Sequence, residues 1–308
     1  MPFVCFTLSR SSPITLSHTR RSMNAMLEDP MWRVKERWRA EVSKLRRGLV
    51  STADVPFASA DGPPFDVDTS KLTRVAGVDV SYRREFIYNS THHQETAVAC
   101  LAVLAYPSMA AQWVDFEEFV VEVPYVPGFL AFRESPALKR LIARCPPRFT
   151  PDVVLVDGNG ACHPDGFGLA CHVGVECGVP TVGIAKDLHC FDGLDVKKVR
   201  MMCDEAVRTS SKEGDGVIAG SNISSWPDAV ALVGDSGTTH GAAVFGHVHT
   251  GDGAGHPVFV SGGHRTSLDL AIELTRLCRL QGHKTPEPIR VADARSRSRV
   301  GQLEGKGP

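Results

Sequence analysis

The segment PDVVLVDGNG places an acid directly at the end of a strand. Residues 153–156 are four apolar residues in succession, a pattern that predicts a strand buried on both faces. Asp157 follows at once, and Gly158, Asn159 and Gly160 come next. Because sites in α/β proteins form at the carboxyl ends of sheet strands, the segment predicts an α/β sheet with a functional acid at its edge.

Three β-rich runs precede this segment, and alternating helices and strands follow it. Residues 75–82, 96–106 and 112–123 have short connections, which favour an antiparallel meander. The later elements are predicted as helices at 132–144, 169–176, 195–210 and 267–280, and as strands at 153–156, 181–185, 229–233, 242–248 and 257–261. This order implies a parallel extension with crossover helices, hence an α/β domain with a mixed sheet flanked by helices.

The two ends of the chain differ from its centre in composition. Residues 1–27 contain no acid and hold Arg10, Arg20 and Arg21 among Ser and Thr, a composition shared by mitochondrial transit peptides and disordered leaders. We favour a disordered leader or an upstream start codon, with Met23 or Met26 as the alternative starts, over a transit peptide.

The remaining residues are expected to form one domain. Residues 28–50 predict an amphipathic helix, and a Gly-, Asp- and Ser-rich loop is predicted at 213–225. We expect a single catalytic domain over 28–290 and a flexible basic tail over 291–308.

Charge and cysteine content restrict the classes of binding surface. The 34 basic and 35 acidic side chains leave a net charge of −1, so any nucleic-acid contact must depend on local patches. No run of about eighteen apolar residues exists, so we expect no membrane span. The nine cysteines form no CxxC pair, which favours reduced thiols inside a cell. Zinc is the alternative reading of Cys162, His163, Cys171, His172 and Cys177, although their spacing matches no structural zinc pattern.

Two further acids, Asp79 and Glu134, are candidates for the same site. Asp79 interrupts the strand VAGVDVSY, and a lone buried Asp is costly. Glu134 lies in the first turn of a predicted helix, where a Glu is also ordinary helix chemistry. Together with Asp157 they give an arrangement that resembles a ribonuclease H-like fold. Carboxylates brought close together repel unless a cation joins them, and Mg²⁺ binds carboxylate and phosphate oxygens.

Several blocks of the sequence resemble the endonuclease V family over about residues 72–295. In order they are GVDVSY, PYVPGFLAFRE, PDVVLVDGNGACHPDGFGLACHVG, PTVGIAK, PVFVSGGHRTS and PEPIRVADA. The resemblance implies a Mg²⁺-dependent endonuclease, with Mn²⁺ as a substitute, that cuts nucleic acid close to inosine.

By this resemblance Asp79, Glu134 and Asp157 bind the metal, and His163 and Lys186 complete the catalytic group. A His near a phosphate can orient water or share a proton, and a Lys can neutralise charge on the scissile phosphate. The alternative readings are a surface-loop His and a solvated strand end.

The resemblance also implies a wedge and a base pocket. The wedge consists of Pro124, Tyr125, Val126 and Pro127, whose aromatic ring would stack beside an extruded base. Gly128, Gly158 and Gly160 would let the backbone approach the base. His264 is expected near the site, Arg265 is expected to contact a phosphate, and Asp152 matches either a further acid of the site or an ordinary strand-start Asp.

The implied substrate is single-stranded nucleic acid that contains inosine. Bacterial members are associated with DNA and animal members with RNA, so the eukaryotic features of this chain favour RNA, with DNA as a second substrate. The implied cut lies at the second phosphodiester 3′ to inosine and leaves 5′-phosphate and 3′-hydroxyl ends. We expect a monomer with no membrane partner, in the cytoplasm and nucleus, including the nucleolus, rather than in mitochondria.

Three rival functions remain. A ribonuclease H-like repair nuclease acting on deaminated or structured DNA would keep the acids without needing the wedge. A non-catalytic reader of inosine-containing RNA would have no reason to keep repelling charges. A nucleotide-binding protein using GNGACH would need GxGxxG spacing or a P-loop, which the motif lacks.

Overall fold

The computed structural model describes residues 31–58, 67–83, 95–210, 228–245 and 256–305. The predicted leader and the predicted 213–225 loop lie outside these residues. The chain divides into two compact units, Met1–Ser43 and Lys44–Pro308. The expected N-terminal helix is present as α2 (Trp32–Leu45), whose larger part belongs to the first unit.

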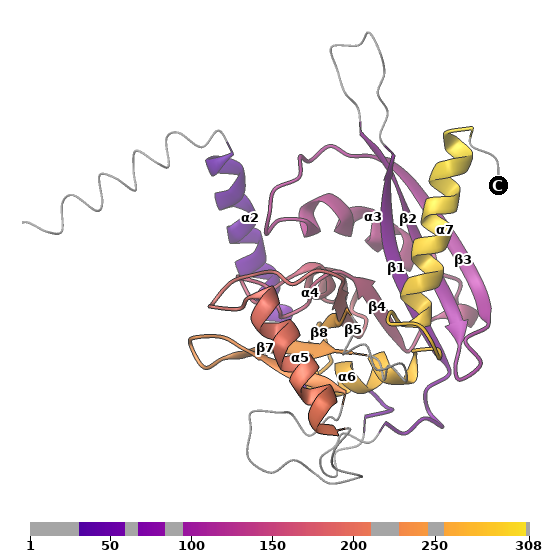
Figure 1. The fold of residues 1–308 in the computed structure, drawn as a ribbon. Coiled ribbons are helices and arrows are strands. Elements are labelled where there is room, and N and C mark those ends of the chain that lie inside the picture. Colours follow the sequence, from indigo (N-terminus) through magenta and orange to yellow (C-terminus); the bar gives the residue numbers. More distant parts are fainter. Residues whose placement is uncertain (1–30, 59–66, 84–94, 211–227, 246–255, 306–308) are drawn as a thin grey trace, which may run out of the picture. The chain divides into compact units, whose positions relative to one another are not determined.

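One mixed sheet of eight strands forms the centre of the second unit (Figure 1), in the order β3-β2-β1-β4-β5-β8-β7-β6. The strands are β1 (Arg74–Arg83), β2 (Thr96–Ala105), β3 (Ala111–Val120), β4 (Val153–Asp157), β5 (Thr181–Ala185), β6 (Ala229–Val233), β7 (Thr239–Val244) and β8 (Val258–Gly262). Strands β1 to β3 form the predicted antiparallel meander, and β4 and β5 continue from β1 in parallel. Beyond β5 the sheet becomes antiparallel again. The α/β fold with a mixed sheet is therefore confirmed.

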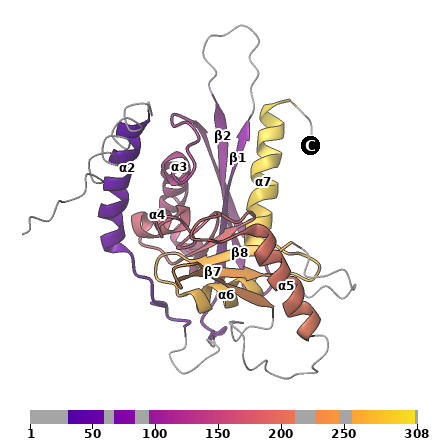
Figure 2. The same cartoon turned by 60° about the vertical axis from the view of Figure 1, so that its left-hand side comes forward.

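Helices cover both faces of this sheet. They are α3 (Ala131–Ala143), α4 (Leu169–Cys177), α5 (Val196–Ser210), α6 (Leu268–Leu277) and α7 (Glu287–Leu303). Figure 2 shows α3 and α4 on one side of β1 and β2, with α7 on the other. The predicted N-cap of α6 is confirmed, because the Ser267 side chain accepts a hydrogen bond from the Leu270 amide. None of the helices in the described part of the chain combines the length and apolarity that crossing a bilayer requires.

The predicted flexible tail is wrong for residues up to Leu303, which belong to α7. Its buried residues Ile289, Ala292, Ser296 and Val300 recur every three or four positions and form one helical face. Two of the four are small, so the pattern is weak in the sequence among many arginines. Small residues allow α7 to pack closely on the sheet. Gly77 of β1 is needed for the same reason, because a Cβ at this position would lie only 2.0 Å from the Pro288 carbonyl oxygen.

Candidate functional site

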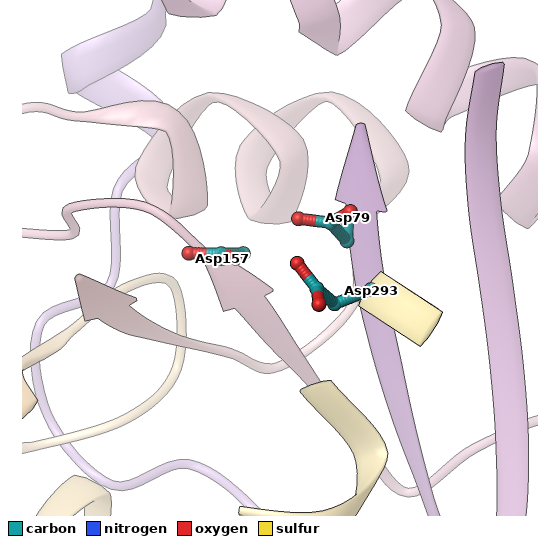
Figure 3. Close-up of side chains that lie close together, drawn as sticks. All are labelled: Asp79, Asp157 and Asp293. Atoms are coloured by element: carbon teal, nitrogen blue, oxygen red, sulfur yellow. The ribbon is translucent and has the colours of Figure 1, made fainter. Parts of the chain in front are cut away.

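Three aspartates meet where the parallel pairing of β1 with β4 ends (Figure 3). They are Asp79 on β1, Asp157 at the end of β4 and Asp293 on α7, and one carboxylate oxygen from each lies within 4.8 Å of the others. Asp79 and Asp157 were predicted as site residues, whereas Asp293 was not. Such a group of hard oxygen ligands could hold a metal ion.

Strand alternation explains why these side chains point the same way. Val75 packs in the core cluster that contains Ile289 of α7, so Asp79, four residues further on, faces α7 as well. On β4, Leu155 belongs to the same cluster, and Asp157 therefore shares its face. Parallel pairing of β1 with β4 sets the two acids side by side, and α7 adds the third.

Asp79 accepts a hydrogen bond from Ser296 and lies close to the carboxylate of Asp157. The Ser296 hydroxyl donates to Asp79 Oδ2 at 2.7 Å, and Ser81 Oγ lies 2.7 Å from Ser296 Oγ. The side chain is only 8% exposed. Burial raises the pKa of Asp79 well above its usual range, and the neighbouring Asp157 raises it further, against the lowering effects of Ser296 and Lys186. A carboxylate in this position is stabilised by a cation.

Lys186 supplies one positive charge to this group. Its Nζ lies 2.5 Å from Asp157 Oδ2 and 3.1 Å from Asp293 Oδ1. Although burial lowers the pKa of Lys186, the charges and hydrogen bonds of Asp157 and Asp293 raise it above its usual value. One ammonium cannot neutralise three carboxylates, so the negative charge of the group favours binding of a further cation. The structure therefore brings Lys186 into the site, against its reading as a solvated strand end.

Glu134 lies beside the three aspartates and outside their 4.8 Å group. It is 6% exposed in the first turn of α3, and the Tyr82 hydroxyl donates to its Oε1 at 2.5 Å. Burial raises the pKa of Glu134 to about 8, and the charges of Asp79 and Asp157 add to the rise, while Tyr82 and Arg133 oppose it. Its predicted metal-binding role stays a prediction.

Arg133 connects this region to the predicted wedge. Its guanidinium lies 4.5 Å from the centre of the Tyr82 ring, pairs with Glu95, and donates to the Val123 carbonyl at 3.0 Å. Val123 immediately precedes Pro124. Arg133 and Tyr82 therefore link Glu134 to the loop of residues 124–128.

The loop of residues 124–128 joins β3 to α3 and presents Tyr125 to solvent. The Tyr125 side chain is 66% exposed, whereas Val126 is buried and accepts a hydrogen bond from the Phe129 amide at 2.9 Å. Gly128 adopts a φ of 82°, a conformation that favours glycine. An exposed aromatic tip on an anchored loop is suited to stacking on a base.

His163 is buried, which contradicts its reading as a surface-loop residue. Its Nδ1 accepts a hydrogen bond from the Asp165 amide at 3.2 Å, and its ring packs edge-on against His189. Burial lowers the pKa of His163, and a hydrogen bond involving the Gly128 backbone partly opposes this effect. The structure thus brings His163 to the loop of residues 124–128.

The glycines after Asp157 serve packing within the protein. Gly158 has a φ of 149°, and a Cβ on Gly160 would lie 2.3 Å from the Gly262 carbonyl oxygen. Gly160 therefore lets two protein segments approach each other. Contact of either glycine with a base stays a prediction.

His264 and Arg265 do not lie with the acids, and their expected place near the site is wrong. Strand β8 runs antiparallel to β5, so its end lies next to Thr181, where β5 begins. The length of β5, roughly 13 Å, separates this edge from Lys186. Arg265 instead pairs with Asp54 at 2.9 Å. The sequence did not reveal the direction of β8.

Asp152 lies at this same edge and acts as a strand-start Asp. Its Oδ2 accepts hydrogen bonds from the Thr73 amide and hydroxyl and from the Arg74 amide. The alternative of a further acid of the site is therefore wrong.

The zinc reading finds no support in the described residues. Among the residues that the structure describes, the side chains of this reading do not gather into a group that could hold an ion, whereas Asp79, Asp157 and Asp293 do.

Comparison with known proteins points to one family. The family described as Endonuclease V matches residues 65–294. The chain is 36% identical to endonuclease V of Mus musculus over 272 residues, which cover 87% of this chain and 70% of the mouse protein. It is 37% identical to endonuclease V of Homo sapiens over 266 residues, which cover 85% of this chain and 82% of the human protein.

Solved structures agree with this result. The catalytic domain of human endonuclease V aligns with a TM-score of 0.70 at 33% identity and covers 89% of this chain and 98% of that one. Endonuclease V of Ciona intestinalis, in complex with DNA containing an inosine followed by a ribo-adenosine, aligns with a TM-score of 0.67 at 26% identity. That alignment covers 88% of this chain and 99% of the Ciona chain.

Proposed function

The chain belongs to the endonuclease V family and is an endonuclease, and we propose that it cleaves single-stranded RNA at inosine, with inosine-containing DNA as a second substrate. The observation that carries this proposal is the group of Asp79, Asp157 and Asp293 with Lys186 at one sheet edge. The Ciona relative was solved with a strand that contains inosine and then a ribonucleotide, which supports both the base and the sugar.

Mg²⁺ is the proposed metal, with Mn²⁺ as a substitute, and the residues present fit it. Asp79, Asp157 and Asp293 would hold the ion through oxygen atoms alone, the ligands that Mg²⁺ prefers. When bound, the ion would supply an activated water and stabilise charge on the leaving oxygen. Lys186 would place a positive charge against the scissile phosphate, and His163 would orient water or exchange a proton near the loop of residues 124–128.

The loop of residues 124–128 is the proposed wedge. Tyr125 is exposed and would stack on a base, while Val126 anchors the loop. Inosine differs from adenosine at one edge of the base, where backbone groups can discriminate between them by hydrogen bonding. The proposed cut lies at the second phosphodiester 3′ to inosine and leaves 5′-phosphate and 3′-hydroxyl ends.

Cleavage of four matched 5′-labelled strands tests this function. They are single-stranded RNA and DNA with either inosine or adenosine at one position, incubated with Mg²⁺ or EDTA. We expect Mg²⁺-dependent cutting near inosine only, faster on RNA, and its loss in Asp157→Asn. Binding without cutting would favour a non-catalytic reader, and cutting indifferent to inosine would favour a repair nuclease of another specificity.

Tyr125→Ala separates recognition from chemistry. We expect it to reduce the preference for inosine over adenosine while Mg²⁺-dependent cutting remains. An unchanged preference would contradict the wedge. A monomeric state and a location in cytoplasm and nucleus stay predictions.

A further inference from the structure

Two pockets lie along the same edge of the sheet and share Lys186. The first has a volume of 440 Å³ and is lined by Asp79, Tyr82, Lys186, Asp293 and Arg297 among others. The second has a volume of 450 Å³, and its charged lining residues are Lys186, Asp187, Arg200 and Lys284. We call this second one the basic pocket. Because Lys186 lines both, the basic pocket adjoins the aspartates.

Charged residues of the basic pocket come from three separate parts of the chain. Lys186 follows β5, Arg200 lies on α5, and Lys284 lies between α6 and α7. Three cations face one acid, Asp187, whereas the neighbouring pocket contains two of the three aspartates. The basic pocket therefore has an excess of positive charge and lies next to the pocket that contains these aspartates.

Two cations of the basic pocket, Arg200 and Lys284, have no acidic partner among the residues that the structure describes. Arg200 Nη2 lies 3.2 Å from His256 Nδ1, a geometry in which a neutral imidazole accepts from the guanidinium. Neither Arg200 nor Lys284 forms an ion pair within that part of the chain. Such donors are available to an external anion, and a guanidinium suits a phosphate.

The remaining lining of the basic pocket is mostly apolar. Val196 and Arg200 lie one helical turn apart on α5, and Pro257 and Phe259 lie opposite at the start of β8. A pocket that combines cations with apolar surface can accept both the phosphate and the sugar of a nucleotide.

We propose that the basic pocket binds the sugar–phosphate backbone of the substrate strand on the 3′ side of the cut. This inference rests on the proposed function, in which inosine lies 5′ to the cut. The loop of residues 124–128 follows β3, the aspartates lie at β1 and β4, and the basic pocket lies at β5 and β8. A strand that enters at the loop and passes the aspartates reaches the basic pocket with its 3′ segment.

Binding of two strand lengths tests the proposal. Fluorescence anisotropy in EDTA would compare the wild type with the double variant Arg200→Ala, Lys284→Ala on a strand that ends just after the cut position and on one that continues. We expect the affinity of the double variant to fall about tenfold for the long strand and to stay unchanged for the short one. The slope of its log affinity against log salt should become shallower by about 0.7 for each phosphate that the variant no longer binds.

A matched control removes the same charge elsewhere. Lys198 and Arg208 are exposed on α5 and do not line the basic pocket. Lys198→Ala, Arg208→Ala should bind both strands like the wild type. An equal fall in affinity for this control, or unchanged binding of the long strand by the pocket variant, would overturn the proposal.

The outcome is separable from that of the proposed function. Backbone contacts do not depend on the base, so the same length comparison on strands containing adenosine measures the basic pocket independently. A wild type that ignores inosine would refute the proposed function, whereas the difference between the long and short strands would still decide the proposal. Circular dichroism would verify that each variant folds.

Discussion

Asp152 and Asp157 lie at opposite ends of β4 and have opposite surroundings. Asp152 receives three hydrogen bonds on one oxygen, from the Thr73 amide, the Thr73 hydroxyl and the Arg74 amide, at 2.7 to 2.9 Å. Asp157 shares its space with the carboxylates of Asp79 and Asp293 and a single ammonium. The first acid is satisfied by hydrogen bonds within the protein, whereas the second lies among like charges that a bound cation would offset. Both residues are aspartates, so the groups around each side chain, and not the residue type, distinguish a structural acid from a candidate functional one.

The largest expected effect is that of Asp157→Asn. Removing one carboxylate of the proposed metal site should lower the single-turnover rate at saturating Mg²⁺ by about 10³-fold. The melting temperature without metal should stay the same or rise, because one repelling charge is gone. Retention of activity within tenfold would remove Asp157 from the chemistry.

Asp293→Asn should follow with a loss of about 10²-fold in the same assay and a higher Mg²⁺ requirement. The substitution keeps the shape of the side chain and removes its charge. Increased stability without loss of activity would mean that Asp293 merely neutralises Lys186.

Asp152→Ala should have the opposite effect to both preceding substitutions, lowering stability and leaving cleavage unchanged. It leaves three donors without their acceptor at a partly exposed position and should lower the free energy of unfolding by about 1–2 kcal/mol. Denaturant titration measures this change. Cleavage per folded molecule should equal that of the wild type, and a selective loss of activity would break the comparison.

The stability that the buried acids Glu134 and Asp79 contribute should depend on pH. The pKa of Glu134 is raised to about 8, and that of Asp79 is raised as well, so the folded protein binds more protons than the unfolded chain above the ordinary carboxyl range. Without metal, the stability contributed by these groups should therefore fall as the pH rises from about 5 to about 8.

Thermal melts in EDTA test the expected fall, which should amount to a few degrees, roughly a change of 1 kcal/mol or more. Mg²⁺ should restore the melting temperature at the high end of this range and have little effect at the low end. A melting temperature in EDTA that rises with pH would contradict the prediction.

Arg265→Ala should have the smallest effect. Its ion pair with Asp54 is largely exposed and contributes about 0–1 kcal/mol. Cleavage should change less than about twofold. A large decrease in substrate binding would return Arg265 to the role suggested by the resemblance.

The sequence predicted most strands, and it predicted the acid at the end of β4 because a strand buried on both faces is a continuous apolar run. Asp157 could be placed from its position at a strand end, and strand alternation then orients it, whereas Lys186 was placed by the family resemblance. Asp293 escaped because α7 packs through small residues such as Ala292 and Ser296, whose periodicity is faint. His264 was misplaced because local pattern does not give the direction of β8.

The close approach of Gly77 to Pro288 joins the first strand of the sheet to its last helix. Strand β1 leaves the ribosome well before α7, which carries Asp293. We expect the nascent chain to hold Asp79 and Asp157 without their third partner until α7 docks, so the three aspartates come together only when this helix packs on the sheet.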